Sequence, residues 1–498
     1  MKVVDAPGVG GVPGAGSSPV DGSRLGLLFL ALLAVAVVLR LPTFSNRIFN
    51  SDEAYLATQA QSLVHGARLY VDTVDRKPPV VPYIYAAVFR VTGSSDLGPV
   101  RVLAVLAQAL TAFLIGVEAR RRFRWRHVGL VAGLLYLLAA SGFRPLDAQA
   151  ASFEVFMLPS MTGALLLGMR GRSAASGAVL AVATLTKQTA LVALVPLVWL
   201  AWRLRRWRGI ALLLGTFAAV IAVTAAVFGW HDFFRWVFTS NGSYLDANGV
   251  LGYALRLGYH QTLWFLFGSL VLVLLALFAS GHWREDLDLW LWLASGVVAV
   301  VAGLRFFGHY YLQLLPPLAL LGVRGLTSVP RLRRLPAAAL VAILAIVPAA
   351  YFLWPAFTGR ESHDTRVALA VGAYVAAHTS PAQRVLVWGQ APEVYWSSNR
   401  RPAVRFATTG FVTGTSGGRP LDHVGERYAV PGAWRDFVDD LEHHPPVLIA
   451  DMSTANQRQA SHYPPDKFPQ FRRYLAQGGW HRVATVDGVA ILRQVARP

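Results

Sequence analysis

Two adjacent acids, Asp52 and Glu53, follow the first strongly apolar run of the chain, in the stretch "FNSDEAYLATQAQSLVHGARLYVDTVDRKPP". Carboxylates beside hydrocarbon are costly to keep charged, so acids at such a position are candidates for function. A carboxylate that reaches a substrate hydroxyl can act as its general base. Because Asn50 and Ser51 are good helix N-caps and acids favour a helix's first turn, the pair could instead only begin a helix. The two interpretations are compatible.

Four cationic or titratable side chains further along the chain could meet an anion: Lys77, Lys187, Arg305 and His309. Lysine and arginine stabilise both a bound phosphate and the charge that develops on a departing one. Arg305 and His309 are four residues apart, which places them on one face of a helix. Simpler interpretations are that Lys77 snorkels to the membrane interface and that Lys187 lies in an ordinary turn. All four are predicted donor-phosphate contacts.

Two further acids, Asp147 and Glu154, lie in a later loop and are predicted to form an acceptor site or a second acidic site. The simpler interpretation is that both are solvated loop acids. The sequence contains no metal-ligand spacing such as HExxH or paired CxxC, so no dedicated metal site is predicted. No cofactor is predicted with certainty, and a divalent metal held by Asp52 and Glu53 stays open as an alternative.

The elements that must position these residues are membrane helices. The 498 residues are 54% hydrophobic and 15% charged, whereas soluble proteins carry about 25% charged residues. Apolar runs of roughly 17–25 residues can each span a bilayer. The sequence therefore predicts a mainly α, polytopic helical membrane protein with about eleven spans. These lie near residues 25–41, 98–119, 128–142, 153–169, 174–186, 189–202, 209–229, 251–280, 287–304, 310–326 and 335–356.

Arginines concentrate in the loops "RRRFRWRH", "RGR", "RLRRWR", "HWRE" and "VRGLTSVPRLRR", which a single topology places on one side of the membrane. By the positive-inside rule that side is the cytoplasm. The net charge of +19 is thus attributed to topology, and no nucleic-acid partner is predicted. One segment, "SAASGAVLAVATLTKQTALVALVPLVWLAW", could be one long helix, which would put its flanking arginines on opposite sides. We predict a hairpin with Lys187 at an outward-facing turn.

Three parts of the chain follow from this topology. Residues 1–23, rich in Gly and Pro, are predicted to be a disordered cytoplasmic tail. Residues 24–357 form the membrane domain, whose first outer loop, 42–98, greatly exceeds the 4–6 residues of a typical connection and should carry juxtamembrane helices. Residues 358–498 alternate strand-like and helical runs and are predicted to be a small extracytoplasmic α/β domain. The candidate site residues all fall on the outer face.

Carboxylates and cations gathered at one membrane face suit a lipid-linked phosphate substrate. A hydroxyl deprotonated by a carboxylate could attack the anomeric carbon of a sugar and release polyprenyl phosphate, without ATP. A nucleotide-sugar donor fits less well, because no phosphate-cradling glycine motif is present. The alternatives are a lipid or sugar transporter or flippase, for which inverted repeats would be typical, and a polymerase or ligase using a lipid-diphosphate-linked glycan.

The acidic pair, followed by "GARLYVDTVDRKPPVVPY", "LTKQTALVALVP" and "GHYYLQLLPPLALLG", resembles the GT-C superfamily of glycosyltransferases over roughly residues 25–356. The nearest branch resembles the protein O-mannosyltransferases and the lipid A aminoarabinose transferases. The resemblance implies inverting transfer from a polyprenyl-phosphate sugar. It also implies that Asp52 is the catalytic base supported by Glu53, that Lys77 and Lys187 contact the donor phosphate, and that Glu154 or Asp147 supplies another functional acid.

The expected protein is therefore a hexosyl- or pentosyltransferase of a bacterial-type cytoplasmic (inner) membrane, acting at its outer face. Its expected partners are a polyprenyl-phosphate sugar donor, the lipid bilayer, and a glycan, lipid or protein acceptor. Sugar and acceptor identity depend on three-dimensional contacts, which the sequence does not specify.

Overall fold

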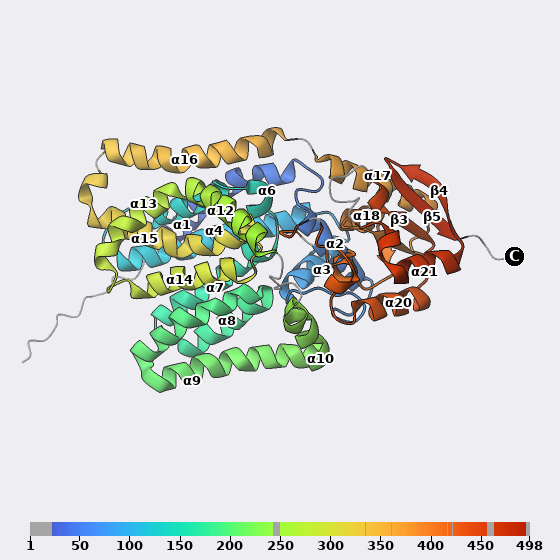
Figure 1. The fold of residues 1–498 in the computed structure, drawn as a ribbon. Coiled ribbons are helices and arrows are strands. Elements are labelled where there is room, and N and C mark those ends of the chain that lie inside the picture. Colours follow the sequence, from blue (N-terminus) through green and yellow to red (C-terminus); the bar gives the residue numbers. More distant parts are fainter. Residues whose placement is uncertain are drawn as a thin grey trace, which may run out of the picture.

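The computed structural model describes residues 22–242, 250–333, 335–359, 361–415, 417–420, 422–455 and 463–494. A bundle of helices occupies one side of the molecule and a small sheet with its own helices occupies the other (Figure 1). Most of the tail predicted at residues 1–23 lies outside the described ranges, and its last two residues already belong to the first helix.

The bundle helices begin and end close to the apolar runs of the sequence. They are α1 (Gly22–Arg40), α4 (Gly98–Arg122), α5 (Val128–Ser141), α7 (Phe153–Met169), α8 (Ser173–Thr186), α9 (Leu194–Phe228), α12 (Leu251–Gly268), α13 (Leu270–Ala279), α14 (Leu287–Ala302), α15 (Leu315–Ser328) and α16 (Leu335–Thr358). The prediction of a mainly helical membrane fold is confirmed.

Within the described residues, four helical segments are individually long and apolar enough to cross a bilayer, and a bent pair would make a fifth. The four are Ser23–Phe44, Gly98–Arg122, Gln188–Phe228 and Ala338–His378. Five apolar helices are shorter than 18 residues, so the total of eleven spans stays a prediction.

The segment around Lys187 forms the predicted hairpin. Helix α8 ends at Thr186, Lys187 is extended (φ −153°, ψ 133°), and the 3-10 turn η2 (Gln188–Ala193) leads into α9. A Cβ on Gly171 would lie 3.6 Å from Nε of Arg205, so the two arginine-rich flanks are at the same end of the bundle. Helix α9 is itself interrupted at Arg206 (φ 52°), which separates residues 194–205 from 207–228.

Residues 251–280, expected as one span, are bent. Helices α12 and α13 meet at an angle of 79° on either side of Ser269. A Cβ on Gly268 would lie 2.3 Å from the carbonyl oxygen of Gly142, so the chain can approach α5 this closely only because Gly268 has no side chain. Both helices are apolar, so the apolar run continues across the bend. For this reason the sequence predicted a single span.

Short elements connect the bundle at the end that faces the sheet (Figure 1). Helix α2 begins at Ser51, where the Asn50 side chain accepts a hydrogen bond from the Asp52 backbone N–H at 2.8 Å, so the acidic pair does lie in a helix's first turn. The elements at this end are η1 (Leu41–Phe44), α2 (Ser51–Val64), α3 (Val80–Thr92), α6 (Pro145–Ala148), α10 (Trp230–Phe234), η3 (Arg235–Thr239) and η5 (Gly308–Leu314). The turns η4 (Ser280–His282) and η6 (Pro330–Arg333) connect helices at the opposite end of the bundle (Figure 1).

The C-terminal part forms a five-stranded sheet of order β2-β1-β3-β5-β4. Strands β2 (Arg401–Pro402), β1 (Arg384–Trp388) and β3 (Leu448–Asp451) are parallel, whereas β5 (Val489–Gln494) and β4 (Trp480–Val486) are antiparallel to their neighbours. Its helices and turns are α17 (His363–His378), α18 (Pro392–Ser398), α19 (Gly410–Thr413), η7 (Glu426–Tyr428), α20 (Ala433–His443), η8 (Met452–Thr454), η10 (Pro465–Lys467) and α21 (Pro469–Gly478).

Helix α2 joins the bundle to the sheet region. The Ser51 hydroxyl donates to Glu393 Oε1 at 2.5 Å, and the Thr58 hydroxyl donates to the Pro392 carbonyl at 3.0 Å. One turn later the Gln61 amide donates to the Trp396 carbonyl at 3.1 Å. These bonds hold α18 along α2, so the loops that follow β1 lie beside the acidic first turn of α2.

Candidate active site

Asp52 and Lys77 line one open pocket of about 180 Å³, which we call the Asp52 pocket. The wall on the membrane side comes from the start of α2, the loop before α3 and the start of α7. The opposite wall comes from loops of the sheet region. The lining residues are Asp52, Tyr55, Asp75, Arg76, Lys77, Phe153, Asn241, Gln390, Thr408, Gly410, Phe411, Thr415 and Gly417. The sequence-predicted base and its predicted phosphate contact thus share one cavity.

Asp52 is the exposed member of the acidic pair. It lies in the first turn of α2, where the N-terminal end of the helix carries partial positive charge. A charged carboxylate at the mouth of a pocket can accept a proton from a hydroxyl that enters it.

Two cations lie on the loop opposite Asp52. The Lys77 ammonium is 4.7 Å from the centre of the Phe153 ring, and the Arg76 guanidinium lies 4.7 Å from the centre of the Phe411 ring. The loop backbone is fixed, since the Tyr70 hydroxyl donates to the Lys77 carbonyl at 2.9 Å and Gln188 donates to the Arg76 carbonyl at 2.5 Å. A ring contact leaves the ammonium able to donate hydrogen bonds to an anion.

Asp75 is the second acid that lines the pocket, and the sequence analysis did not single it out. Burial raises its pKa to about 6, although Lys77 and Arg76 oppose the shift. Its Oδ2 atom is buried without a hydrogen-bond partner in the described part of the chain. The only signal in the sequence was its position two residues before Lys77.

Glu53 points away from the pocket and is fully buried. Its Oε2 accepts hydrogen bonds from Arg101 Nη2 at 2.7 Å and Nε at 3.0 Å, and its Oε1 accepts one from the Ala151 backbone N–H at 2.9 Å. Glu53 therefore ties α2 to α4 and to the turn before α7. With both oxygens engaged, it is poorly placed to hold a metal ion jointly with Asp52.

The predicted residues Asp147, Glu154, Lys187 and His309 come together in what we call the buried cluster. Lys187 is paired with Glu154, and its ammonium lies 4.1 Å from the centre of the Tyr310 ring. His309 Nδ1 is 2.5 Å from Asp147 Oδ1, and His309 Nε2 is 3.7 Å from Glu154 Oε1. The sequence analysis gave the acids and the cations separate roles, whereas the structure pairs them with each other.

Arg305 contacts the sheet region. Its Nη1 donates to the Gly417 carbonyl at 2.8 Å, and Arg419 donates in return to the Leu304 carbonyl at 3.1 Å. Both neighbours of Arg305, Leu304 and Phe306, have φ of 48°, a strained conformation that is frequent at functional sites. Gly417 lines the Asp52 pocket, so Arg305 braces a loop that closes it.

A second pocket of about 380 Å³ lies on the other side of the α2 start, and we call it the acidic pocket. Its described lining includes three carboxylates, Glu361, Asp364 and Glu393, and no lysine or arginine. Burial raises the pKa of Glu393 to about 7, although its hydrogen bond with Ser51 opposes the shift. Gln390 lines both this pocket and the Asp52 pocket.

Within the described residues, no three His, Asp or Glu side chains are grouped so that they could hold a metal ion. The prediction that Lys187, Arg305 and His309 contact a donor phosphate is not tested by this geometry and stays a prediction. The same holds for Asp147 and Glu154 as acceptor acids.

Known proteins share the fold of this chain. The model of glycosyltransferase family 87 matches residues 81–307 of the chain. ArnT from Cupriavidus metallidurans, in a structure bound to undecaprenyl phosphate, superposes with a TM-score of 0.59 at 14% identity, over 96% of this chain and 99% of that one. The chain has the GT-C fold. The resemblance to the GT-C superfamily, and within it to the aminoarabinose transferase branch, is thereby confirmed.

Two archaeal structures extend the comparison. The Archaeoglobus fulgidus oligosaccharyltransferase in its apo form has a TM-score of 0.56 at 12% identity, over 94% of this chain and 74% of that one. AglB from Archaeoglobus fulgidus, in complex with an inhibitory peptide and a dolichol-phosphate, has a TM-score of 0.50 at 11% identity, over 96% and 75%. No curated protein matches the sequence of this chain significantly. The family match supports the interpretation of this chain as a glycosyltransferase. The matched residues do not include Asp52 or Lys77.

Proposed function

We propose that this membrane protein transfers a sugar from a polyprenyl-phosphate donor to an acceptor hydroxyl, with inversion at the anomeric carbon. The observation that carries the proposal is the shared pocket of Asp52 and Lys77, a general base and a phosphate-binding cation facing one cavity. The fold supports it, because the ArnT and AglB structures with this fold hold undecaprenyl phosphate and dolichol-phosphate, respectively.

The reaction is a single displacement. Asp52 accepts the proton of the acceptor hydroxyl as its oxygen attacks the anomeric carbon. The bond between that carbon and the phosphate oxygen breaks, and polyprenyl phosphate leaves with the electron pair. Lys77, fixed beside Phe153, stabilises the charge that develops on the departing phosphate. Attack from the side opposite the leaving group inverts the anomeric configuration.

The acceptor would enter through the acidic pocket. Its carboxylates Glu361 and Asp364 disfavour an anionic donor there, while the cations of the Asp52 pocket attract one. The two pockets flank the first turn of α2, so a hydroxyl from one side and a phosphate from the other would meet at Asp52. Glu53, through Arg101, holds that turn in place.

We further propose that the site lies at the outer face of a bacterial-type cytoplasmic membrane, with the N-terminus in the cytoplasm. The support is the positive-inside rule, applied to the arginine-rich loops. Two of these loops, at Gly171 and at Arg205, lie close together at one end of the bundle. The site and the sheet region lie at the opposite end of the bundle (Figure 1). The sugar, hexose or pentose, is left open by the proposal.

The proposal is tested with the full chain in proteoliposomes that contain a labelled polyprenyl-phosphate sugar and a soluble hydroxyl acceptor outside. We expect labelled acceptor and free polyprenyl phosphate in equal amounts, with the anomeric configuration inverted by NMR. Movement of the lipid-linked sugar across the bilayer without product would contradict the proposal in favour of a flippase. Transfer only from a lipid-diphosphate-linked glycan would favour the polymerase or ligase.

A further inference from the structure

Asp75 is a buried acid of the Asp52 pocket to which the proposed reaction gives no role. It lines the cavity, it is 6% exposed, and its Oδ2 atom has no hydrogen-bond partner within the described residues. A buried carboxylate oxygen without a partner is destabilising, because its hydration is lost and no hydrogen bond replaces it. Such an atom at the wall of a pocket is therefore a candidate contact for a ligand.

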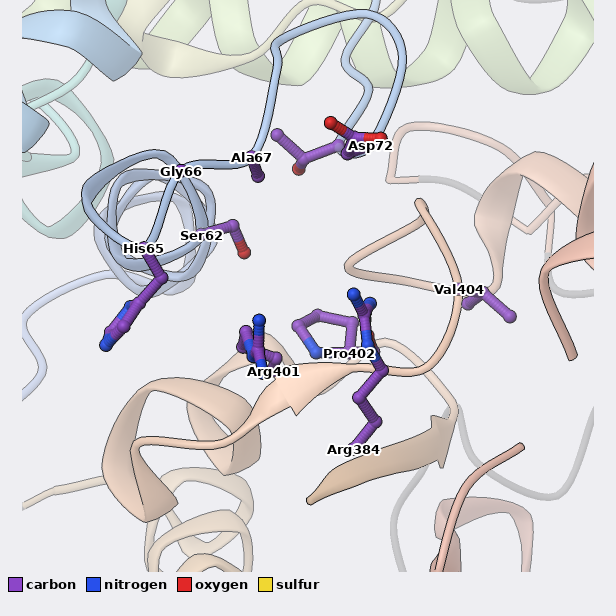
Figure 2. A pocket seen from close by; sticks show the side chains of 10 residues that line it. Ser62, His65, Gly66, Ala67, Asp72, Arg384, Arg401, Pro402 and Val404 are labelled. Carbon is purple, nitrogen blue, oxygen red and sulfur yellow. The ribbon is translucent and has the colours of Figure 1, made fainter. Parts of the chain in front are cut away.

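Asp72, three residues earlier in the same loop, has a different environment. Its side chain is 43% exposed, and its Oδ2 accepts hydrogen bonds from the Arg68 backbone N–H at 2.8 Å and from Arg68 Nε at 3.2 Å. Figure 2 shows Asp72 at another pocket, across from Arg384 and Arg401. The unpartnered oxygen is thus particular to Asp75 and is not shared by the other acid of this loop.

The backbone beside Asp75 is held in place by both halves of the molecule. The Val74 N–H donates to the Arg405 carbonyl of the sheet region at 3.1 Å. The Val74 carbonyl accepts hydrogen bonds from the Tyr55 hydroxyl and the Gln59 amide of α2, both at 3.2 Å. The two residues after Asp75 are fixed by the carbonyl contacts described above. The carboxylate is therefore kept at the pocket wall, and a ligand that bonds to it loses little binding free energy to ordering the loop.

The charge of Asp75 restricts the group that can bind to it. Burial raises its pKa to about 6, so at pH 7.5 the carboxyl is ionised; it repels a phosphate but accepts a charge-assisted hydrogen bond from a hydroxyl. In the proposed reaction the donor phosphate meets Lys77, two residues away, and the acceptor reaches Asp52 from the acidic pocket. Asp75 lines the Asp52 pocket and is not among the described lining residues of the acidic pocket. The hydroxyl nearest to it therefore belongs to the sugar of the donor.

We propose that Asp75 binds one hydroxyl group of the transferred sugar and makes that hydroxyl a requirement for a good donor. The hydroxyl donates to Oδ2, which gives this buried atom a partner. A site built for a hydrogen bond rejects an analogue that lacks the donor group, because the buried polar atom is then left unpaired. The inference rests on the proposed function, since it needs a polyprenyl-phosphate sugar in the Asp52 pocket.

The test measures binding to the full chain in nanodiscs, without acceptor. The ligands are bare polyprenyl phosphate, one hexose donor (polyprenyl-phosphate mannose), one pentose donor (polyprenyl-phosphate arabinose) and the monodeoxy analogues of each. We expect the better donor to bind at least about tenfold more tightly than bare polyprenyl phosphate. One of its monodeoxy analogues should bind about 10- to 100-fold more weakly than the donor itself, the usual effect of losing a hydrogen bond to a charged group.

Substitutions of Asp75 should remove this discrimination. Asp75→Ala should bind the better donor and the weak monodeoxy analogue equally, with affinity for bare polyprenyl phosphate unchanged or slightly higher, because an acid near the phosphate is removed. Asp75→Asn, which keeps an acceptor oxygen but loses the charge, should retain part of the discrimination. Asp72→Asn, in the same loop but outside the lining of the Asp52 pocket, is the matched control and should behave as wild type.

Three results would overturn the inference. The first is a wild-type chain that binds bare polyprenyl phosphate but discriminates against no monodeoxy donor. The second is discrimination that Asp75→Ala leaves intact, which would assign it to another residue. The third is an Asp75→Ala variant that raises the KM of the acceptor and leaves donor binding unchanged, which would assign the contact to the acceptor. Failure of bare polyprenyl phosphate to bind the wild-type chain would instead contradict the proposed function, on which the inference depends.

Discussion

The Asp52 pocket and the buried cluster each contain a lysine and a carboxylate. In the pocket they face an open cavity, whereas in the cluster they are buried and paired with each other. In the pocket, Lys77 rests against Phe153 and faces an open cavity together with Asp52. In the cluster, one residue further along α7, Glu154 is paired with Lys187, and both are buried. A cation already neutralised inside the fold holds helices together, whereas a cation beside a cavity can meet a ligand. We therefore expect substitution of Asp52 or Lys77 to change transfer or donor binding, and substitutions in the cluster to change stability.

The largest expected effect is on turnover in the pocket. Asp52→Asn should lower kcat about 100- to 10,000-fold, the usual contribution of a general base, with donor binding and thermal stability unchanged. Asp232→Asn, at a partly exposed acid of α10, is the matched control. Turnover by Asp52→Asn within a few-fold of wild type would remove Asp52 from the mechanism.

In the cluster, Lys187→Met should leave Glu154 buried without its partner and lower the free energy of unfolding by about 3–5 kcal/mol. The double variant Lys187→Met/Glu154→Gln should regain most of that loss, because it removes both charges. Denaturant unfolding of the purified protein measures both. A stable Lys187→Met protein that binds donor poorly would mean that the lysine serves the ligand and that the comparison is wrong.

Asp75 tests the cost of a buried acid that lacks a partner for one oxygen. Its pKa is raised in the folded state to about 6, so the folded protein binds more protons than the unfolded chain between roughly pH 4 and 6, and stability falls as pH rises through that range. Asp75→Asn should thus stabilise the protein at pH 7.5, by at most about 3 kcal/mol, and should have little effect at pH 4. An equal effect at both pH values would contradict the assignment.

The smallest effect is expected from Lys77. Lys77→Gln should weaken binding of polyprenyl phosphate about tenfold, the loss of one charge-assisted hydrogen bond, and leave unfolding unchanged. Arg90→Gln, at an exposed arginine of α3, controls for general loss of positive charge near the membrane. Unchanged donor affinity would show that the phosphate is bound elsewhere.

The sequence predicted the helices well because each membrane span needs a long apolar run, and such runs are visible without structural information. The alternation of strand-like and helical runs likewise predicted a mixed α/β structure for residues 358–498. The two-residue strand β2 and the bend between α12 and α13 were missed, since neither has a periodic pattern. The hairpin at Lys187 was found from arginine placement, which constrains both flanks at once.

Within the site, local sequence identified Asp52 and Lys77 but not their surroundings. Glu53 meets Arg101, 48 residues away, and Lys187 meets Glu154, 33 residues away. Neither pairing has a local signature, so predicted roles for Glu53 and Lys187 could not separate a buried ion pair from a ligand contact. Asp75 was missed for the same reason, because its burial depends on packing between distant segments.

The most direct test is to determine where the donor phosphate binds, by cryo-electron microscopy of the full chain in nanodiscs with polyprenyl phosphate. We expect phosphate density in the Asp52 pocket, within hydrogen-bond distance of the Lys77 ammonium, with the Lys187–Glu154 pair intact. Phosphate bound by Lys187, with Glu154 displaced, would contradict the assignment of the Asp52 pocket as the donor site.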